Sequence, residues 1–283
     1  MFLILWLMPI AFYALTWWTT GWSLSPDGAF YCSMGRGERV PRPYAQRWLL
    51  PAVLGDRPTL WRVWGALAVV LSAVLVGEYA GTSFQTKLIA ELLFMGLPGL
   101  WRLNVRLPVL VDPTALCCAL GGALLMRAGH PWLATTLVLM GTSVKETTFL
   151  FAAIFAGHGV FLTGAFIALV NRWSRDHRPN PAEPWLHNPV QEARKAHDFL
   201  NPVEKIVPWG AVALLLILGG FRDMTPLTWV AVGLAYAQCL AAQDNARLFQ
   251  WSAPMLIAVV LKHPPAWVGM AAVLGLFNPY RGT

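Results

Sequence analysis

Long apolar runs recur along nearly the whole chain, and this pattern restricts the possible fold more than any single motif. A helix needs about 20 residues to cross a hydrocarbon core. Eight runs reach or approach that length: 1–20, 59–80, 84–101, 107–128, 206–221, 225–242, 247–262 and 265–278. The apolar stretch 132–170 is interrupted at Lys145–Glu146 and at 157–159, which predicts three short helices. We therefore expect an all-α protein, a polytopic transmembrane helical bundle of about ten or eleven membrane helices, some of them short.

The composition supports this class and excludes others. Of the 283 residues, 57% are hydrophobic and 12% are charged, whereas soluble domains carry roughly 25% charged residues. This excludes intrinsic disorder and a small disulfide scaffold. The net charge of +7 comes from basic residues in loops between the apolar runs, where lipid headgroups attract them. We therefore expect membrane lipids as partners and no nucleic acid.

The first 18 residues contain no charged side chain, and no basic segment precedes the apolar run. We interpret this run as a retained first transmembrane helix; the alternative is a cleaved leader. We expect residues 1–283 to form a single transmembrane domain with no separate soluble domain.

Two polar loops, 21–58 and 171–205, are expected to hold interfacial amphipathic helices. In the first loop, Tyr44 and Trp48 are one helical turn apart in the run PYAQRWLLPAVLG, which favours a helix in the interface plane. The second is Pro-rich and predicts a short amphipathic helix at about 190–200.

Charged groups at membrane depth are costly unless they are paired or face water, so they are the first candidates for function. Asp27 lies between Pro26 and Gly28 in SPDGAFY. A carboxylate fixed there can act as a general base if it reaches a substrate hydroxyl. The alternative is a turn-forming Asp that caps a helix.

Lys145 and Glu146 are consecutive, so on a helix they point about 100° apart and need different partners or water. At a helix break beside a water-filled cleft, Lys145 can hold a phosphate. The alternative is a plain loop with two solvated charges.

Asp244 and Arg247 are spaced i,i+3 in QDNARLFQWSAP. They can form a structural salt bridge, or Arg247 can bind a phosphate through both arms of its guanidinium. Arg47 can extend to lipid headgroups or turn inward to a lipid-linked phosphate. The four cysteines show no metal-binding or disulfide spacing. Nucleotide-hydrolysis and zinc-protease motifs are also absent from the sequence.

The order of these segments resembles the GT-C superfamily of polytopic glycosyltransferases, which use polyprenyl-phosphate-linked sugars. The resemblance covers most of the chain and rests on a first helix followed by SPDGAFY, RPYAQRWLLP, LPVLVDPTAL, GTSVKETTFLF and QDNARLFQWSAP. Many members carry two consecutive acids where this chain has Asp27–Gly28, and many are longer, with a soluble C-terminal domain.

The resemblance implies a glycosyltransferase that moves a sugar from a polyprenyl-phosphate-linked donor to an acceptor hydroxyl of a glycan, lipid or protein. It implies Asp27 as the general base. We expect no cofactor; a divalent metal remains an alternative, for which the sequence offers no clear acidic pair. The resemblance also implies a cytoplasmic N-terminus and a site on the outer face of a bacterial plasma (inner) membrane. Arg247, Lys145 and Arg47 would bind the donor phosphate. The other residues of the cleft would be Asp112, Glu146, Asp244 and Tyr44.

Two further classes remain open. The first is a small transporter or flippase for a lipid-linked or anionic substrate, in which buried charges line a pathway. The sequence shows no internal repeat of the kind that transporters often carry. The second is a membrane subunit without catalytic activity that only assembles with other proteins.

Overall fold

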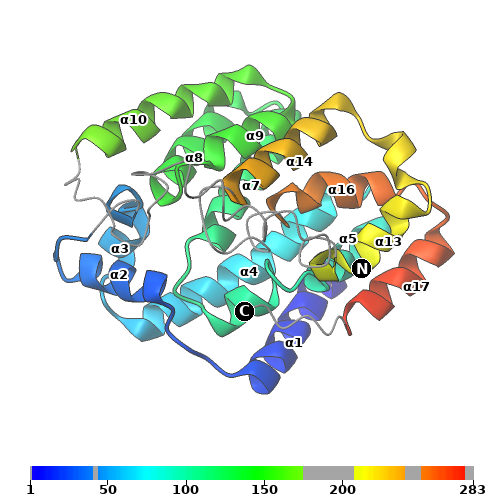
Figure 1. Ribbon diagram of the computed structural model, residues 1–283, viewed down its shortest axis with the longest axis horizontal. Coiled ribbons are helices and arrows are strands. Elements are labelled where there is room, and N and C mark those ends of the chain that lie inside the picture. Colours follow the sequence, from blue (N-terminus) through cyan, green and yellow to red (C-terminus); the bar gives the residue numbers. More distant parts are fainter. Residues whose placement is uncertain (1, 41–43, 175–206, 240–249, 278–283) are drawn as a thin grey trace, which may run out of the picture. The chain divides into compact units, whose positions relative to one another are not determined.

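The computed structural model describes residues 2–40, 44–174, 207–239 and 250–277, and within these ranges all regular elements are helices (Figure 1). The expected all-α class is therefore confirmed. The chain divides into two compact units. The first unit comprises Met1–Thr19, Ala73–Leu103 and Pro184–Thr283, and the second comprises Thr20–Ser72 and Asn104–Glu183.

The first unit is built around α5. Its helices are α1 (Phe2–Thr20), the end of α4 (Pro58–Ala80), α5 (Phe84–Met95), α13 (Ala211–Ile217), α14 (Pro226–Cys239), α16 (Ala253–Val260) and α17 (Pro265–Gly275), with short 3-10 turns at η4 (Val207–Trp209), η5 (Gly220–Asp223) and η6 (Gln250–Ser252). Helix α5 packs against α16 and α17. Buried Gln250 joins two further segments, because it accepts from the Leu100 amide at 3.1 Å and donates to the Pro208 carbonyl at 2.9 Å.

The second unit contains the start of α4 and the helices on which most candidate residues lie. These are α2 (Pro26–Gly35), η1 (Tyr44–Gln46), α3 (Leu49–Leu54), α6 (Arg102–Arg106), α7 (Asp112–Arg127), α8 (Pro131–Val144), α9 (Thr148–Ala156), η2 (Gly159–Thr163) and α10 (Gly164–Ser174). Helix α6 straddles the boundary between the units.

Helices α7, α8 and α9 form the centre of the second unit, and α7 contacts both of the others. Glycines allow this close approach. A Cβ at Gly122 would lie 2.4 Å from Val138, and a Cβ at Gly141 would lie 2.4 Å from Cys118. Helix α7 also begins with Asp112 and ends with Arg127, charges that complement its dipole.

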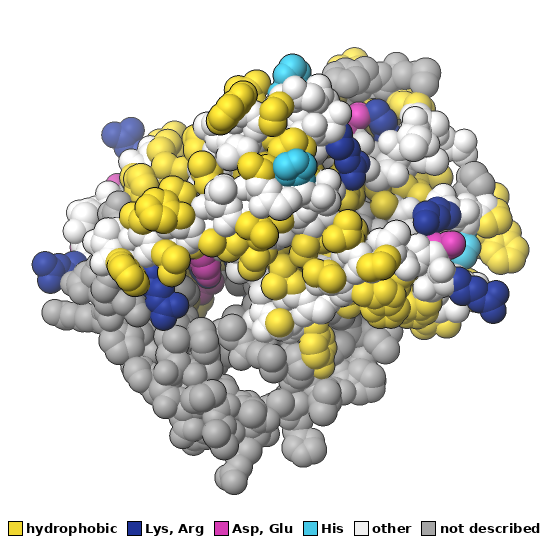
Figure 2. Space-filling view, turned by 90° about the horizontal axis from the view of Figure 1, so that it is seen from above, with side chains coloured by type: hydrophobic (Ala, Val, Ile, Leu, Met, Phe, Trp, Pro, Cys, Tyr) yellow, Lys and Arg dark blue, Asp and Glu magenta, His cyan; other side chains and the backbone are white. Residues whose placement is uncertain are grey.

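Among the residues that the structure describes, two helices are long and apolar enough to cross a membrane, at Leu3–Thr20 and Pro58–Ala80. Large apolar side chains lie on the surface, and Trp18, Trp132 and Trp173 are each more than 80% exposed. On the face seen in Figure 2, many hydrophobic side chains are exposed, and most Lys and Arg lie toward the edges of the view. Exposed apolar area of this kind is typical of a surface that contacts lipid or another protein.

Several predicted runs are shorter as helices than the sequence indicated. The run 84–101 stops being α-helical at Met95, where Gly96 and Pro98 follow. The run 107–128 becomes α-helical only at Asp112, because Pro113 is suited to the first turn of a helix, where its missing N–H is not needed. In the run 206–221 the α-helix extends only from Ala211 to Ile217, because Gly210 and Gly219 take positive φ values on either side.

The predicted division of 132–170 into three helices is confirmed by α8, α9 and α10, with breaks at Lys145–Glu146 and near Gly157. The loop 21–58 holds helices as expected, but no single helix contains both Tyr44 and Trp48. A 3-10 turn, η1, is followed by a separate short helix, α3, which begins at Leu49. The helix expected at about 190–200 lies outside the described residues.

Candidate functional site

Asp27 lies in the first turn of α2, where the positive end of the helix dipole stabilises its negative charge. The helix is capped by Ser25, whose hydroxyl accepts from the Gly28 amide at 2.9 Å. The alternative role of Asp27 as the cap is therefore wrong. Gly28 allows α2 to approach the chain before α7, because a Cβ there would lie 3.0 Å from the Val109 Cβ.

The carboxylate of Asp27 accepts a hydrogen bond from the Tyr44 hydroxyl at 2.9 Å. The Tyr44 ring stacks on Phe30 with centroids 4.6 Å apart and meets Tyr31 edge-on at 5.7 Å. Burial raises the pKa of Tyr44 above its ordinary value, and the charge and hydrogen bond of Asp27 raise it further. Tyr44 is therefore a neutral donor that holds one carboxylate oxygen of Asp27 in place.

Tyr31 connects this pair to a cation. It lies one helical turn after Asp27 on α2, it is 1% exposed, and its hydroxyl accepts from Arg47 Nη1 at 3.2 Å. Burial raises the pKa of Tyr31, although the Arg47 guanidinium opposes this effect. Tyr31 was not identified as a site residue from the sequence. The signal was its i,i+4 spacing from Asp27, which places both side chains on one face of a helix.

Arg47 forms a two-armed ion pair with Glu146. Its Nε lies 2.9 Å from Oε2 and its Nη2 lies 2.6 Å from Oε1. The side chains are 14% and 30% exposed, respectively. Planar pairs of this kind are among the stronger charge-assisted contacts in proteins. A phosphate that binds Arg47 at these positions must replace the Glu146 carboxylate.

Lys145 forms a second ion pair, with Asp112 at the start of α7. Both side chains are almost fully buried, at 4% and 3% exposure. Helix α8 ends at Val144, and Lys145 takes an extended conformation. The two consecutive charges therefore face different partners: Lys145 faces Asp112, and Glu146 faces Arg47. The prediction that Lys145 and Glu146 need separate partners is confirmed. The ammonium of Lys145 is therefore engaged by a carboxylate in this structure.

Two polar side chains hold the loop around Arg47 against the helices. The Trp48 indole donates to Asn171 on α10 at 3.1 Å, and the Asn171 amide donates to Ser143 on α8 at 3.3 Å. Asn171 is buried and was not identified from the sequence, because its partners come from distant segments. The network fixes the position from which Arg47 reaches Glu146.

The second unit thus brings together six of the eight predicted site residues: Asp27, Tyr44, Arg47, Asp112, Lys145 and Glu146. Asp244 and Arg247 lie outside the described residues. Among the side chains that the structure describes, no group of three or more His, Cys, Asp or Glu is placed to hold a metal ion.

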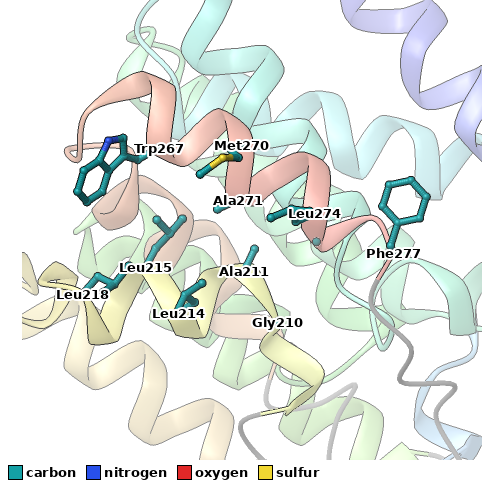
Figure 3. A pocket seen from close by; sticks show the side chains of 11 residues that line it. Gly210, Ala211, Leu214, Leu215, Leu218, Trp267, Met270, Ala271, Leu274 and Phe277 are labelled. Atoms are coloured by element: carbon teal, nitrogen blue, oxygen red, sulfur yellow. The ribbon is translucent and has the colours of Figure 1, made fainter.

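A separate groove of about 380 Å³ lies between α13 and α17 in the first unit (Figure 3). On one side of the groove are Leu214, Leu215 and Leu218, which face Met270 and Leu274 on the other side. Trp267 and Phe277 lie toward the two ends of the groove. Its lining side chains carry no titratable group. The groove therefore offers apolar contact and no acid–base chemistry.

Comparison with protein-family models, curated proteins and solved structures found no match for this chain.

Proposed function

We propose that this chain is a membrane glycosyltransferase of GT-C type, which transfers a sugar from a polyprenyl-phosphate-linked donor to an acceptor hydroxyl of a glycan, lipid or protein. One observation carries the proposal. A continuous series of contacts runs from Asp27 through Tyr44 and Tyr31 to Arg47. It places a carboxylate for proton transfer in the same cluster as a cation that suits a phosphate.

Asp27 is the general base in this proposal. As the acceptor oxygen bonds to the anomeric carbon, its proton moves to the Asp27 carboxylate, and the bond between that carbon and the phosphate oxygen breaks. The bonding electrons leave with the polyprenyl phosphate. Tyr44 donates to one Asp27 oxygen and so orients the carboxylate toward the incoming hydroxyl, which is the main geometric requirement for a base.

Arg47 is the cation that we assign to the leaving phosphate. A guanidinium binds a carboxylate and a phosphate with the same two-armed geometry. Glu146 occupies that position here, so donor binding exchanges one anion for another without leaving Arg47 unpaired. Lys145 and Arg247 remain proposed phosphate ligands. Asp112, Glu146 and Asp244 remain proposed residues of the cleft.

We further propose a bundle of about ten or eleven membrane helices, which includes the short ones enclosed by other protein. The two membrane-length helices and the exposed tryptophans support a membrane location. In this arrangement the N-terminus is cytoplasmic, and the Asp27 site faces outward from a bacterial plasma membrane. Labelling of cysteines introduced at Ser25 and Ser33 from each side of the membrane tests this orientation; labelling only from the cytoplasmic side would reverse it.

The decisive experiment measures sugar transfer from polyprenyl-phosphate donors by the purified protein and its Asp27→Asn variant. Asparagine keeps the size and the acceptor for Tyr44 but cannot take a proton, so we expect a loss of about 10²- to 10⁴-fold. Asp56→Asn is the matched control, because Asp56 is an exposed carboxylate in the same loop. Near-normal transfer by Asp27→Asn would exclude Asp27 as the base. Lost stability together with lost activity would indicate a structural role.

A transporter or flippase is the second candidate, and Glu91 on α5 favours it. Glu91 is fully buried, and among the described residues neither of its carboxylate oxygens has a hydrogen-bond partner. Acidic groups of this kind often mark ion or proton pathways. Turnover in detergent without any gradient would support the enzyme, whereas substrate movement that requires sealed vesicles and Glu91 would support the transporter.

A further inference from the structure

A second hollow in the second unit shares elements with the Asp27 site and has no role in the mechanism above. Its volume is about 240 Å³, and η1 and the residues beside it contribute to both places. Tyr44 bonds to Asp27, whereas the next residue, Ala45, lines the hollow. Likewise Arg47 pairs with Glu146, and the next residue, Trp48, lines the hollow.

The lining combines an aromatic ring with charged groups. The Trp48 indole N–H is bonded to Asn171, which fixes the ring. Met34, Val40 and Pro51 add apolar surface, and Glu38 and Arg39 are exposed lining residues. Glu38 pairs with Arg36 at 2.5 Å, and this contact lowers the pKa of Glu38. At neutral pH Glu38 therefore offers carboxylate acceptors and Arg39 offers donors.

These features suit one class of ligand. A sugar ring has an apolar C–H face that packs on an aromatic ring and a rim of hydroxyls that both donate and accept hydrogen bonds. Glu38 and Arg39 give the lining one charge of each sign, so its charges do not select an anion over a neutral ligand. The volume is below the range of about 300–1,000 Å³ that drug-sized ligands occupy, which suits a single ring.

We propose that this hollow binds one neutral sugar ring of a glycan acceptor, whose reacting hydroxyl extends past η1 to Asp27. The inference rests on the proposed transferase function for the identity of the acceptor, but the sugar site itself is separately testable. Trp48 supplies the stacking face, Glu38 accepts from ring hydroxyls, and Arg39 donates to them.

The test uses saturation-transfer difference NMR with the full chain in detergent and the methyl glycosides of glucose, galactose, mannose and arabinose as probes. We expect at least one glycoside to bind. Trp48→Ala should weaken binding about tenfold by removing the aromatic face, whereas Trp48→Phe should retain most of it. Trp132→Ala is the matched control, because Trp132 is 86% exposed on α8 and does not line the hollow.

Two further variants keep the test decisive if Trp48→Ala does not fold. Ala52→Trp fills the hollow from its exposed edge and should abolish binding, and Glu38→Gln should weaken it. Failure to bind any glycoside, or binding that none of these variants changes, would overturn the inference. Preferential binding of glycerol phosphate would also overturn it, since it would indicate a site for anionic headgroups.

The outcomes separate this inference from the proposed function. Asp27→Asn should lose sugar transfer but keep glycoside binding. If the protein transfers no sugar from any donor and glycosides still bind through Trp48, the sugar site stands and the transferase proposal fails. If transfer depends on Asp27 and glycosides bind independently of Trp48, the transferase stands and the acceptor hollow fails.

Discussion

Replacement of Glu146 by Gln should lower the stability of the protein and raise its affinity for the donor phosphate. Both effects follow from one contact. Glu146 offers two oxygens to Arg47 at 2.6 and 2.9 Å, and glutamine can offer only one neutral oxygen. The Arg47 charge would then stay in a place where only 14% of its side chain reaches solvent.

The size of the stability loss follows from this burial. Removal of one partner of a fully buried ion pair costs about 3–5 kcal/mol, and an exposed pair contributes about 0–1 kcal/mol. Since the Glu146 side chain is 30% exposed and Tyr31 still accepts from Arg47, we expect about 2 kcal/mol. Denaturant titration in detergent measures this value. Glu38→Gln is the control, because its pair with Arg36 is exposed and should have no measurable effect.

Donor affinity should change in the opposite direction. A phosphate no longer has to displace a carboxylate from Arg47, so a polyprenyl phosphate should bind more tightly to Glu146→Gln than to the unmodified protein. Equilibrium binding of a fluorescent polyprenyl phosphate measures this. If the affinity is unchanged, Arg47 does not bind the donor. If affinity falls together with stability, Glu146 itself contributes to the donor site.

Three other perturbations give clear expectations. Asp112→Asn should lower the unfolding free energy by about 3–5 kcal/mol, because it leaves the Lys145 ammonium buried beside a neutral group. The double variant Asp112→Leu with Lys145→Met should recover most of this loss, and denaturant titration measures both values. Gly28→Ala should cost about 1–3 kcal/mol by overpacking, whereas Gly233→Ala, with open space around its new methyl group, should not destabilise; equal effects in thermal unfolding would contradict the packing argument. Folding raises the pKa of Tyr44, so its contribution to stability should be complete below about pH 10 and lost as the pH rises further. Unfolding measurements between about pH 8 and 11 should therefore show a decline in stability that is smaller in Tyr44→Phe.

Local sequence was sufficient for features that depend on neighbouring residues. Lys145 and Glu146 interrupt an apolar stretch, and two adjacent charges within a helix cannot share one partner, so a break with separate partners was predictable. The all-α class followed from the apolar runs. Asp27, Tyr44 and Arg47 were identified because polar groups stand out against such a background.

Contacts between distant segments were beyond that reasoning. The hydrogen bond from Tyr44 to Asp27 crosses 17 positions and the Arg47–Glu146 pair crosses 99, and no local period encodes either of them. The amphipathic spacing of Tyr44 and Trp48 suggested one helix. However, Tyr44 bonds to Asp27 from η1, and Trp48 bonds to Asn171 from the position before α3. Tertiary contacts commonly override such local patterns.

The adjacent charges at the end of α8 also determine the register of the chain there. Lys145 faces Asp112, and Glu146 faces Arg47. A slip by one residue would set carboxylate against carboxylate at one contact or cation against cation at the other, where burial makes repulsion expensive. Electrostatic repulsion therefore disfavours misregistered packing of α8. An apolar helix surface alone would not, because it can slide against its neighbours at little cost. The four charges of these two ion pairs, which belong to the candidate site, thus also specify how the second unit assembles.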